Sequence, residues 1–272
     1  MCSLKMLAMI FVLALFPTAP KSGEFQVDLE LALLVDRSNS MRPKEQLLQR
    51  EGYVRAIGSP EIVELIRAGP LGRIALTYIE FSDSEDTYTA IPWTLIDGVA
   101  SARRFAASLA EYPLTSGGGT IISHGLLFAA DSFDGNGFDG LRRTIDVSGD
   151  GPNSGGVPVV EARDDVVARG IRINGLPILL DPDTAGIIRF KDLDSYYRDC
   201  VIGGAGAFVI PVTRPEHIGD AIHRKMAMEI AGGESIEQED GRDILLPVLG
   251  ELPTDCKIGE KQIEKLYDNE GD

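Results

Sequence analysis

The chain has 272 residues, of which 44% are hydrophobic and 25% are charged, and its formal net charge is -16 at pH 7. This length and hydrophobic share allow one large domain with a substantial core, with or without tails. The negative charge excludes a protein whose main partner is nucleic acid, because such proteins need a basic surface. It is compatible with cation binding or with simple solubility.

The N-terminus has the pattern of an export signal. Lys5 precedes an apolar run over residues 6–16, which is too short to span a bilayer comfortably but matches the core of a signal peptide. We therefore expect residues 1–23 to be a signal peptide or an N-terminal anchor, and the protein to be periplasmic or secreted. A buried helix is the alternative interpretation. An uncleaved N-terminus would be the route to membrane association.

Strand and helix patterns alternate after this segment. Residues 29–41 hold an apolar run of strand length that ends in Asp36, Ser38 and Ser40, and an unbroken run of this kind is typical of a strand buried on both faces. Further strands are expected at residues 73–81, 88–93, 142–148, 171–180 and 207–212. Helices are expected at residues 43–57, 61–67, 101–112, 123–133, 158–169, 192–199 and 217–231.

This alternation predicts an α/β fold, a doubly wound and mostly parallel sheet with helices on both faces. Pro92 places its strand at an edge of the sheet, because proline cannot donate to a neighbouring strand. Ser101 is the expected N-cap of the helix that follows.

The composition becomes acidic and poor in apolar residues after Gly232 and Gly233. We therefore expect a compact domain over residues 24–232 and an acidic C-terminal tail over residues 233–272. Within that tail, residues 244–252 are candidates to dock on the domain, and residues 258–267 are candidates for a short amphipathic helix.

The cysteines agree with export. Cys2 lies in the expected signal, which leaves Cys200 and Cys256 as an even pair that an oxidising compartment could join. The alternative is two separate thiols, with Cys200 buried and Cys256 in a solvated tail.

Three loops supply oxygen-bearing side chains. The first carries Asp36, Ser38 and Ser40, the Gly-rich second carries Thr120, and the third carries Asp150. Hydroxyl and carboxylate oxygens suit Mg²⁺ or another hard divalent cation such as Mn²⁺ or Ca²⁺. Ligands of open α/β sheets bind outside the carboxyl ends of the strands, where these loops are expected. Each residue alone has a plain alternative as a helix cap or turn residue.

Residues 36–40, Asp-Arg-Ser-Asn-Ser, match the Asp-x-Ser-x-Ser motif of von Willebrand factor type A domains, in which the motif forms the metal-ion-dependent adhesion site. Thr120 and Asp150 match the second and third pieces of that site in the right order. Gly149 stands where many relatives carry Thr, and Arg37 is expected to add a positive charge at the rim. The resemblance covers residues 27–231. Segments that resemble an exported proteobacterial group of such domains are residues 49–54, 91–94, 145–153 and 196–204.

The resemblance implies that Ser38, Ser40 and Thr120 hold a divalent cation, and that Asp36 and Asp150 act partly through water. An open coordination position would then accept Asp or Glu from a protein partner. The expected function is a cation-dependent, adhesion-type protein-binding module, and not an enzyme.

Two alternatives remain open from the sequence. One is a metal-free structural α/β scaffold. The other is a Mg²⁺-dependent phosphoryl-transfer hydrolase with Asp36 as nucleophile, although Ser38 stands where a second carboxylate would be needed as general acid. The spacing of His124, His217 and His223 does not indicate a zinc site.

Overall fold

A five-stranded sheet forms the centre of the computed structural model, which describes residues 24–84, 86–180, 192–232 and 254–270. Its strand order is β4-β3-β2-β6-β7, and every neighbouring pair is parallel except β3 with β4. The strands are β2 (Glu30–Asp36), β3 (Ile74–Phe81), β4 (Tyr88–Ile96), β6 (Arg143–Gly149) and β7 (Arg172–Pro177). The predicted mostly parallel sheet is confirmed, with the Pro92 strand at its edge.

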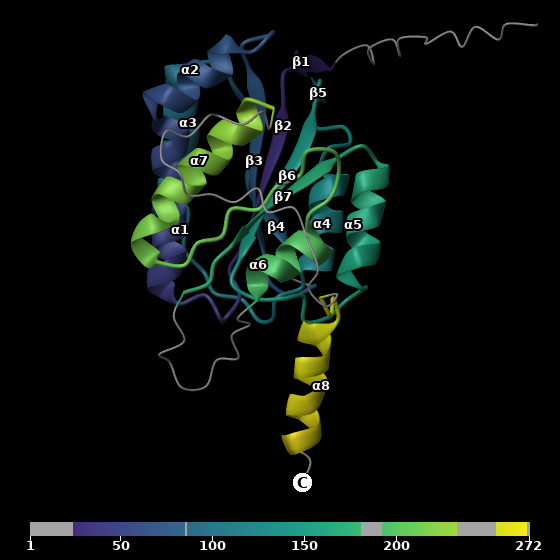
Figure 1. Ribbon diagram of the computed structural model, residues 1–272. Coiled ribbons are helices and arrows are strands. Elements are labelled where there is room, and N and C mark those ends of the chain that lie inside the picture. The colour runs from purple at the N-terminus through teal and green to yellow at the C-terminus, as the bar shows by residue number, and fades with distance from the viewer. Residues whose placement is uncertain (1–23, 85, 181–191, 233–253, 271–272) are drawn as a thin grey trace, which may run out of the picture.

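Helices cover both faces of this sheet (Figure 1). The helices on one side are α1 (Pro43–Gly58), α2 (Pro60–Ala68), α3 (Val99–Glu111) and α7 (Ile218–Ile230). Those on the other are α4 (Ile122–Asp131), α5 (Val159–Ala168) and α6 (Leu193–Tyr196), the last continued by the π-helix η1 (Tyr197–Val201). A short 3₁₀ helix, η2 (Pro215–His217), precedes α7.

Strand β2 is buried along its whole length and separates the two hydrophobic clusters. Leu31 and Leu33 belong to the cluster beneath α1 and α7, whereas Ala32 and Leu34 belong to the cluster beneath α4 and α5. Each leucine buried in this way contributes about 1.5–3 kcal/mol to stability. This packing fixes Asp36, the last residue of β2, between the ends of β3 and β6.

Two buried charged networks lie on the α1 and α7 side. In the first, Lys225 forms an ion pair with Asp146 on β6 and a second, at 2.7 Å, with Glu229 Oε1. Asn174 donates a hydrogen bond of 3.0 Å to the same Glu229 oxygen. Burial raises the pKa of Glu229 to about 7, because desolvation and the charge of Asp146 together outweigh the attraction of Lys225.

The second network includes Gln49 and Arg50, two polar residues of the segment at residues 49–54. Arg50 forms a buried ion pair with Glu80 on β3 and donates to the carbonyls of Leu109, at 3.1 Å, and Tyr112, at 2.9 Å. Gln49 donates to Ser148 Oγ at 2.8 Å, which joins α1 to the strand that leads to Asp150. These polar residues of α1 therefore connect it to both halves of the sheet.

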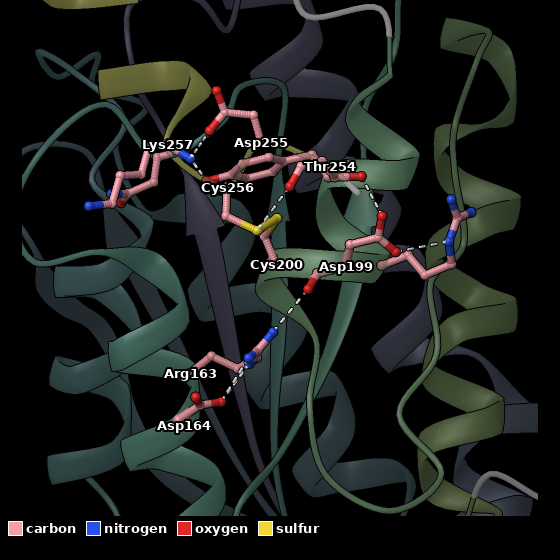
Figure 2. The surroundings of a disulfide bond; sticks show 11 residues. Arg163, Asp164, Asp199, Cys200, Thr254, Asp255, Cys256 and Lys257 are labelled. Atoms are coloured by element: carbon pink, nitrogen blue, oxygen red, sulfur yellow. Dashed lines mark hydrogen bonds and ion pairs between the residues drawn. A yellow bond between two sulfur atoms is a disulfide. The ribbon is translucent and has the colours of Figure 1, made fainter. Parts of the chain in front are cut away.

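The last helix, α8 (Ile258–Glu270), is attached to the domain by a disulfide between Cys200 and Cys256 (Figure 2). Thr254 also bonds to Asp199, beside Cys200. At the first turn of α8, Asn153 Nδ2 donates a hydrogen bond of 2.7 Å to Glu260 Oε1. The end of the chain thus returns to the loop that follows Asp150.

Some expectations differ from the structure. Residues 207–212 form only isolated bridges at Val209 and Val212 instead of a strand. Ser101 is not the N-cap of α3, which is Gly98. It lies at the third helical position, where its hydroxyl accepts from the Gly98 amide at 3.1 Å. The small parallel sheet of β1 (Phe25–Val27) and β5 (Phe138–Gly140) was not expected.

The expected signal or anchor at residues 1–23 and the candidate docking segment at residues 244–252 lie outside the described residues. Within the described part of the chain, no helix combines the length and the apolar character needed to cross a membrane.

Candidate metal centre

The loops after β2 and β6 meet through hydroxyl and carboxylate groups. Ser40 Oγ donates a hydrogen bond of 2.6 Å to Asp150 Oδ1, and it lies 2.9 Å from Ser38 Oγ. Asp36 Oδ1 accepts from the Ser38 amide at 2.7 Å, which turns the chain sharply at the end of the strand. Asp36, Ser38, Ser40 and Asp150 therefore form one connected group.

Thr120 lies beside the Asp150 loop. The Thr120 amide donates to Ser154 Oγ at 3.0 Å, and the Ser154 amide donates to the Thr120 carbonyl at 2.8 Å. A Cβ atom built on Gly151 would lie 3.6 Å from Thr120 Oγ1. The structure thus brings Thr120 against the residue that follows Asp150, so all five residues named from the sequence belong to neighbouring loops.

The electrostatics of the group favour a positive ion. Asp36 is 1% exposed, and its Oδ2 atom has no hydrogen-bond partner among the described residues. Burial and, after it, the nearby charge of Asp150 together raise the pKa of Asp36 to about 8. Two carboxyl groups in this position repel one another when both are ionised, and a cation between the loops would relieve that repulsion.

The donor set fits a hard cation that retains water. Among the described residues, no group of three or more His, Cys, Asp or Glu side chains could hold a metal. The group instead combines three hydroxyls with two carboxylates, which are the oxygen ligands that Mg²⁺, Mn²⁺ and Ca²⁺ accept. A soft or tetrahedral zinc site of cysteine and histidine does not match it.

Arg37 does not point its charge at this group. Its guanidinium forms an ion pair of 2.6 Å with Asp86, donates to Thr115 Oγ1 at 3.3 Å and lies over the Tyr88 ring. The Arg37 carbonyl accepts from the Gly117 amide at 2.8 Å. The expected positive charge at the rim is therefore neutralised by Asp86, and Arg37 instead joins the Gly-rich loop to the loop after β3.

Sequence reasoning gave no role to Tyr197, which contributes a buried hydroxyl near Asp36. A Cβ built on Gly149 would lie 2.7 Å from Asp36 Oδ2 and 2.9 Å from the Tyr197 hydroxyl. The sequence feature that could have indicated this role is Gly149. A glycine before Asp150 leaves space beside the site, and the Tyr197 side chain occupies it.

The hydrolase alternative gains no support from the geometry. A phosphoryl-transfer site with Asp36 as nucleophile would need a second carboxylate two positions on as general acid, and the residue there is Ser38. Two of the three histidines also have other partners, since His223 contacts Ser59 and Glu61 and His217 contacts Arg214.

Solved structures share this fold at low sequence identity. Proximal thread matrix protein 1 from the mussel byssus, with a zinc occupied MIDAS motif, is 16% identical with a TM-score of 0.56, and the match covers 76% of this chain and 49% of that one. For the von Willebrand factor type A protein from Catenulispora acidiphila, the identity is 12%, the TM-score 0.52 and the coverage 75% and 43%.

The vWF domain of the type V pili tip protein Mfa5 from Porphyromonas gingivalis is 9% identical with a TM-score of 0.52, and the match covers 78% of this chain and 98% of that one. The chain therefore spans about half of the mussel protein but nearly all of the pilus-tip domain. These identities establish the fold alone. No curated protein matches the sequence.

The model of the family described as "Protein of unknown function (DUF1194)" matches residues 26–234, which are most of the chain. The chain therefore belongs to the DUF1194 family, and its fold is that of a von Willebrand factor type A domain.

Proposed function

We propose that the protein is a divalent-cation-dependent binding module that engages an acidic residue of a protein partner. Ser38, Ser40 and Thr120 would hold the cation, with Asp36 and Asp150 acting partly through water. The observation that carries this proposal is the connected group of Ser38, Ser40 and Asp150, placed beside the buried and unpartnered Oδ2 of Asp36.

The small number of carboxylates explains why the partner would be acidic. Asp36 and Asp150 are the two carboxylates of the group, and a divalent ion that they share with neutral hydroxyls and water retains an attraction for a further anion. A glutamate or aspartate of a partner can complete the coordination. Mg²⁺ is the first candidate ion, with Mn²⁺ and Ca²⁺ as the others.

Three observations support an exported binding protein. The solved structures that share the fold include the domain of a pili tip protein and the pilus adhesin SpaC from Lactobacillus rhamnosus GG. The disulfide between Cys200 and Cys256 suits an oxidising compartment. Residues 1–23 carry the pattern of an export signal. We infer a periplasmic or secreted protein with a domain over residues 24–232 and an acidic tail over residues 233–272.

Isothermal titration with Mg²⁺ and with Mn²⁺, after treatment with a chelator, tests the metal site. We expect saturable binding by the wild type and none by the Ser38→Ala/Ser40→Ala double variant. A matched control is Ser101→Ala/Ser132→Ala, which removes two hydroxyls from α3 and from the end of α4. This control should bind as the wild type does. Absence of binding by the wild type would favour the metal-free scaffold.

A second titration tests the open coordination position. Glutarate should bind the Mn²⁺-loaded protein, whereas glutaramide, which has the same shape without the charge, should not. Equal binding of both compounds, or equal binding of glutarate with and without the metal, would contradict an acidic partner at the ion.

A further inference from the structure

The ring of Tyr197 occupies a space that two glycines leave open. Gly149 and Gly175 lie on the adjacent strands β6 and β7. A Cβ at Gly175 would lie 2.8 Å from Tyr197 Cδ1, and a Cβ at Gly149 would lie 2.9 Å from the Tyr197 hydroxyl. A side chain at Gly175 would therefore collide with the ring, and one at Gly149 would collide with its hydroxyl and with Asp36. The ring is fully buried, so its hydroxyl faces the end of β6 and not solvent.

Two buried polar atoms lie around the position of the missing Gly149 side chain. The Tyr197 hydroxyl and Asp36 Oδ2 are both within 3 Å of that point, and neither has a hydrogen-bond partner among the described residues. A buried polar group without a partner is rare and costs free energy. A tyrosine hydroxyl carries its proton at neutral pH and can serve as a hydrogen-bond donor.

We propose that Tyr197 is a positioning residue of the metal centre, whose hydroxyl donates to Asp36 Oδ2 directly or through one water molecule. The hydrogen bond would hold the carboxylate in the orientation that supports a cation at Ser38 and Ser40. Because Gly149 has no side chain, no side chain at that position can bond to Asp36 Oδ2, and the Tyr197 hydroxyl would make this contact instead. This inference rests on the proposed function, because it assigns a role within the same site.

The backbone holds Tyr197 in place independently of its hydroxyl. The residue begins the π-helix η1, and its carbonyl accepts from the Ile202 amide at 2.9 Å. The same turn contains Cys200, which the disulfide joins to Cys256 (Figure 2). Single π turns are frequent at functional sites. The backbone therefore fixes the ring, and it places the hydroxyl within 3 Å of the same point beside Gly149 as Asp36 Oδ2.

The first test compares Tyr197→Phe with Tyr78→Phe by titration with Mg²⁺. Tyr78 is an equally buried tyrosine on β3, packed against Tyr53 and Arg50. We expect Tyr197→Phe to bind Mg²⁺ about tenfold more weakly than the wild type, because a hydrogen bond to a charged group is lost. Tyr78→Phe should bind within about twofold of the wild type. Wild-type affinity in Tyr197→Phe would overturn the inference and leave the proposed metal site standing.

The second test needs no metal and separates the two proposals. Urea unfolding with a chelator present would measure Asp36→Asn, Tyr197→Phe and the double variant. We expect the two changes to be coupled by about fivefold in the unfolding equilibrium constant, whereas Asp36→Asn and Tyr78→Phe should be additive. Additivity of Asp36→Asn with Tyr197→Phe would overturn the role of Tyr197. If the two changes are coupled but the wild type binds no metal, the contact between Tyr197 and Asp36 is supported and the cation is rejected.

Discussion

Ser40 and Asp150 are 110 residues apart in the sequence, yet Ser40 Oγ donates a hydrogen bond of 2.6 Å to Asp150 Oδ1. The bond joins the loop after β2 to the loop after β6. It also holds Asp150 near Asp36, and the charge of Asp150 disfavours the ionisation of Asp36. The closeness of the two carboxyl groups is unfavourable in the protein alone, but it would be favourable with a divalent cation bound between them.

Asp150→Asn should separate metal binding from stability. Asparagine keeps an acceptor for Ser40 but removes the charge that raises the pKa of Asp36. We expect the thermal midpoint without metal to be unchanged or higher, and the stabilisation by Mg²⁺ to disappear. For the wild type, that stabilisation should be about 2.7 kcal/mol at a Mg²⁺ concentration 100 times the Kd. Differential scanning fluorimetry with and without Mg²⁺ measures both. An undiminished response to Mg²⁺ in Asp150→Asn would count against the site.

Reduction of the disulfide should destabilise the domain and release α8. Cys200 and Cys256 are separated by 56 positions, and a cross-link over a loop of that length stabilises a protein by about 4 kcal/mol in the chain-entropy model. Helix α8 has 13 residues and is too short to be stable alone. We expect hydrogen exchange in α8 to accelerate on reduction and the urea midpoint to fall. The Cys200→Ser/Cys256→Ser variant is the control, and reductant should leave it unchanged.

Stability should decrease as the pH rises from about 4.5 to 7, in part because of Glu229. Its pKa is raised from 4.5 to about 7, so the folded protein binds a proton that the unfolded chain releases in this range. The contribution is fully present below pH 4.5, is lost by pH 7 and amounts to about 3 kcal/mol. Asp146 and Asp36, whose pKa values are also raised, add in the same direction.

Urea unfolding at pH 5 and pH 8 would measure this dependence. Glu229→Gln should make it shallower, with the remainder due to Asp36 and Asp146, whereas Glu216→Gln, which changes an exposed residue before α7, should follow the wild type. A pH dependence in Glu229→Gln that is as steep as that of the wild type would assign the whole effect to other groups.

For the buried ion pair between Arg50 and Glu80, removal of one charge should destabilise the protein more than removal of both charges. Arg50→Met leaves the Glu80 carboxylate buried without its cation, and we expect a loss of about 3–5 kcal/mol in the free energy of unfolding. Arg50→Met/Glu80→Gln should recover part of that loss, because no buried charge remains. Urea denaturation of the three proteins tests this. A double variant less stable than Arg50→Met would show that Glu80 has another stabilising role.

The sequence was sufficient for the central sheet because its strands are long and strongly apolar. Strand β2 is buried on both faces, and its unbroken apolar pattern indicated that position. The succession of strands and helices along the chain followed from the alternation of strand-type and helix-type hydrophobic periodicity. Residues 207–212 have the composition of a strand but meet β7 only at isolated bridges, and composition cannot show whether a partner lies in register.

The candidate site was predictable only in part. The sequence motif of von Willebrand factor type A domains and the loops that carry it identified five residues, which are Asp36, Ser38, Ser40, Thr120 and Asp150. The pairing of Arg37 with Asp86, and the approach of Tyr197 to Asp36, depend on how separate loops fold against one another. The disulfide has the same character, since two cysteines in a sequence do not reveal whether their Cα atoms lie 5.5 Å apart.

The disulfide also determines how mechanical force would travel through the protein. Tension applied at the C-terminus passes along α8 to Cys256 and then crosses the covalent bond to Cys200. It therefore enters the domain through η1, next to the loop that carries Asp150. The chain between the two cysteines, which includes α7, is bypassed. A pull through α8 would therefore load the face that holds the candidate metal centre first, and α7 would lie outside the covalent path of the force.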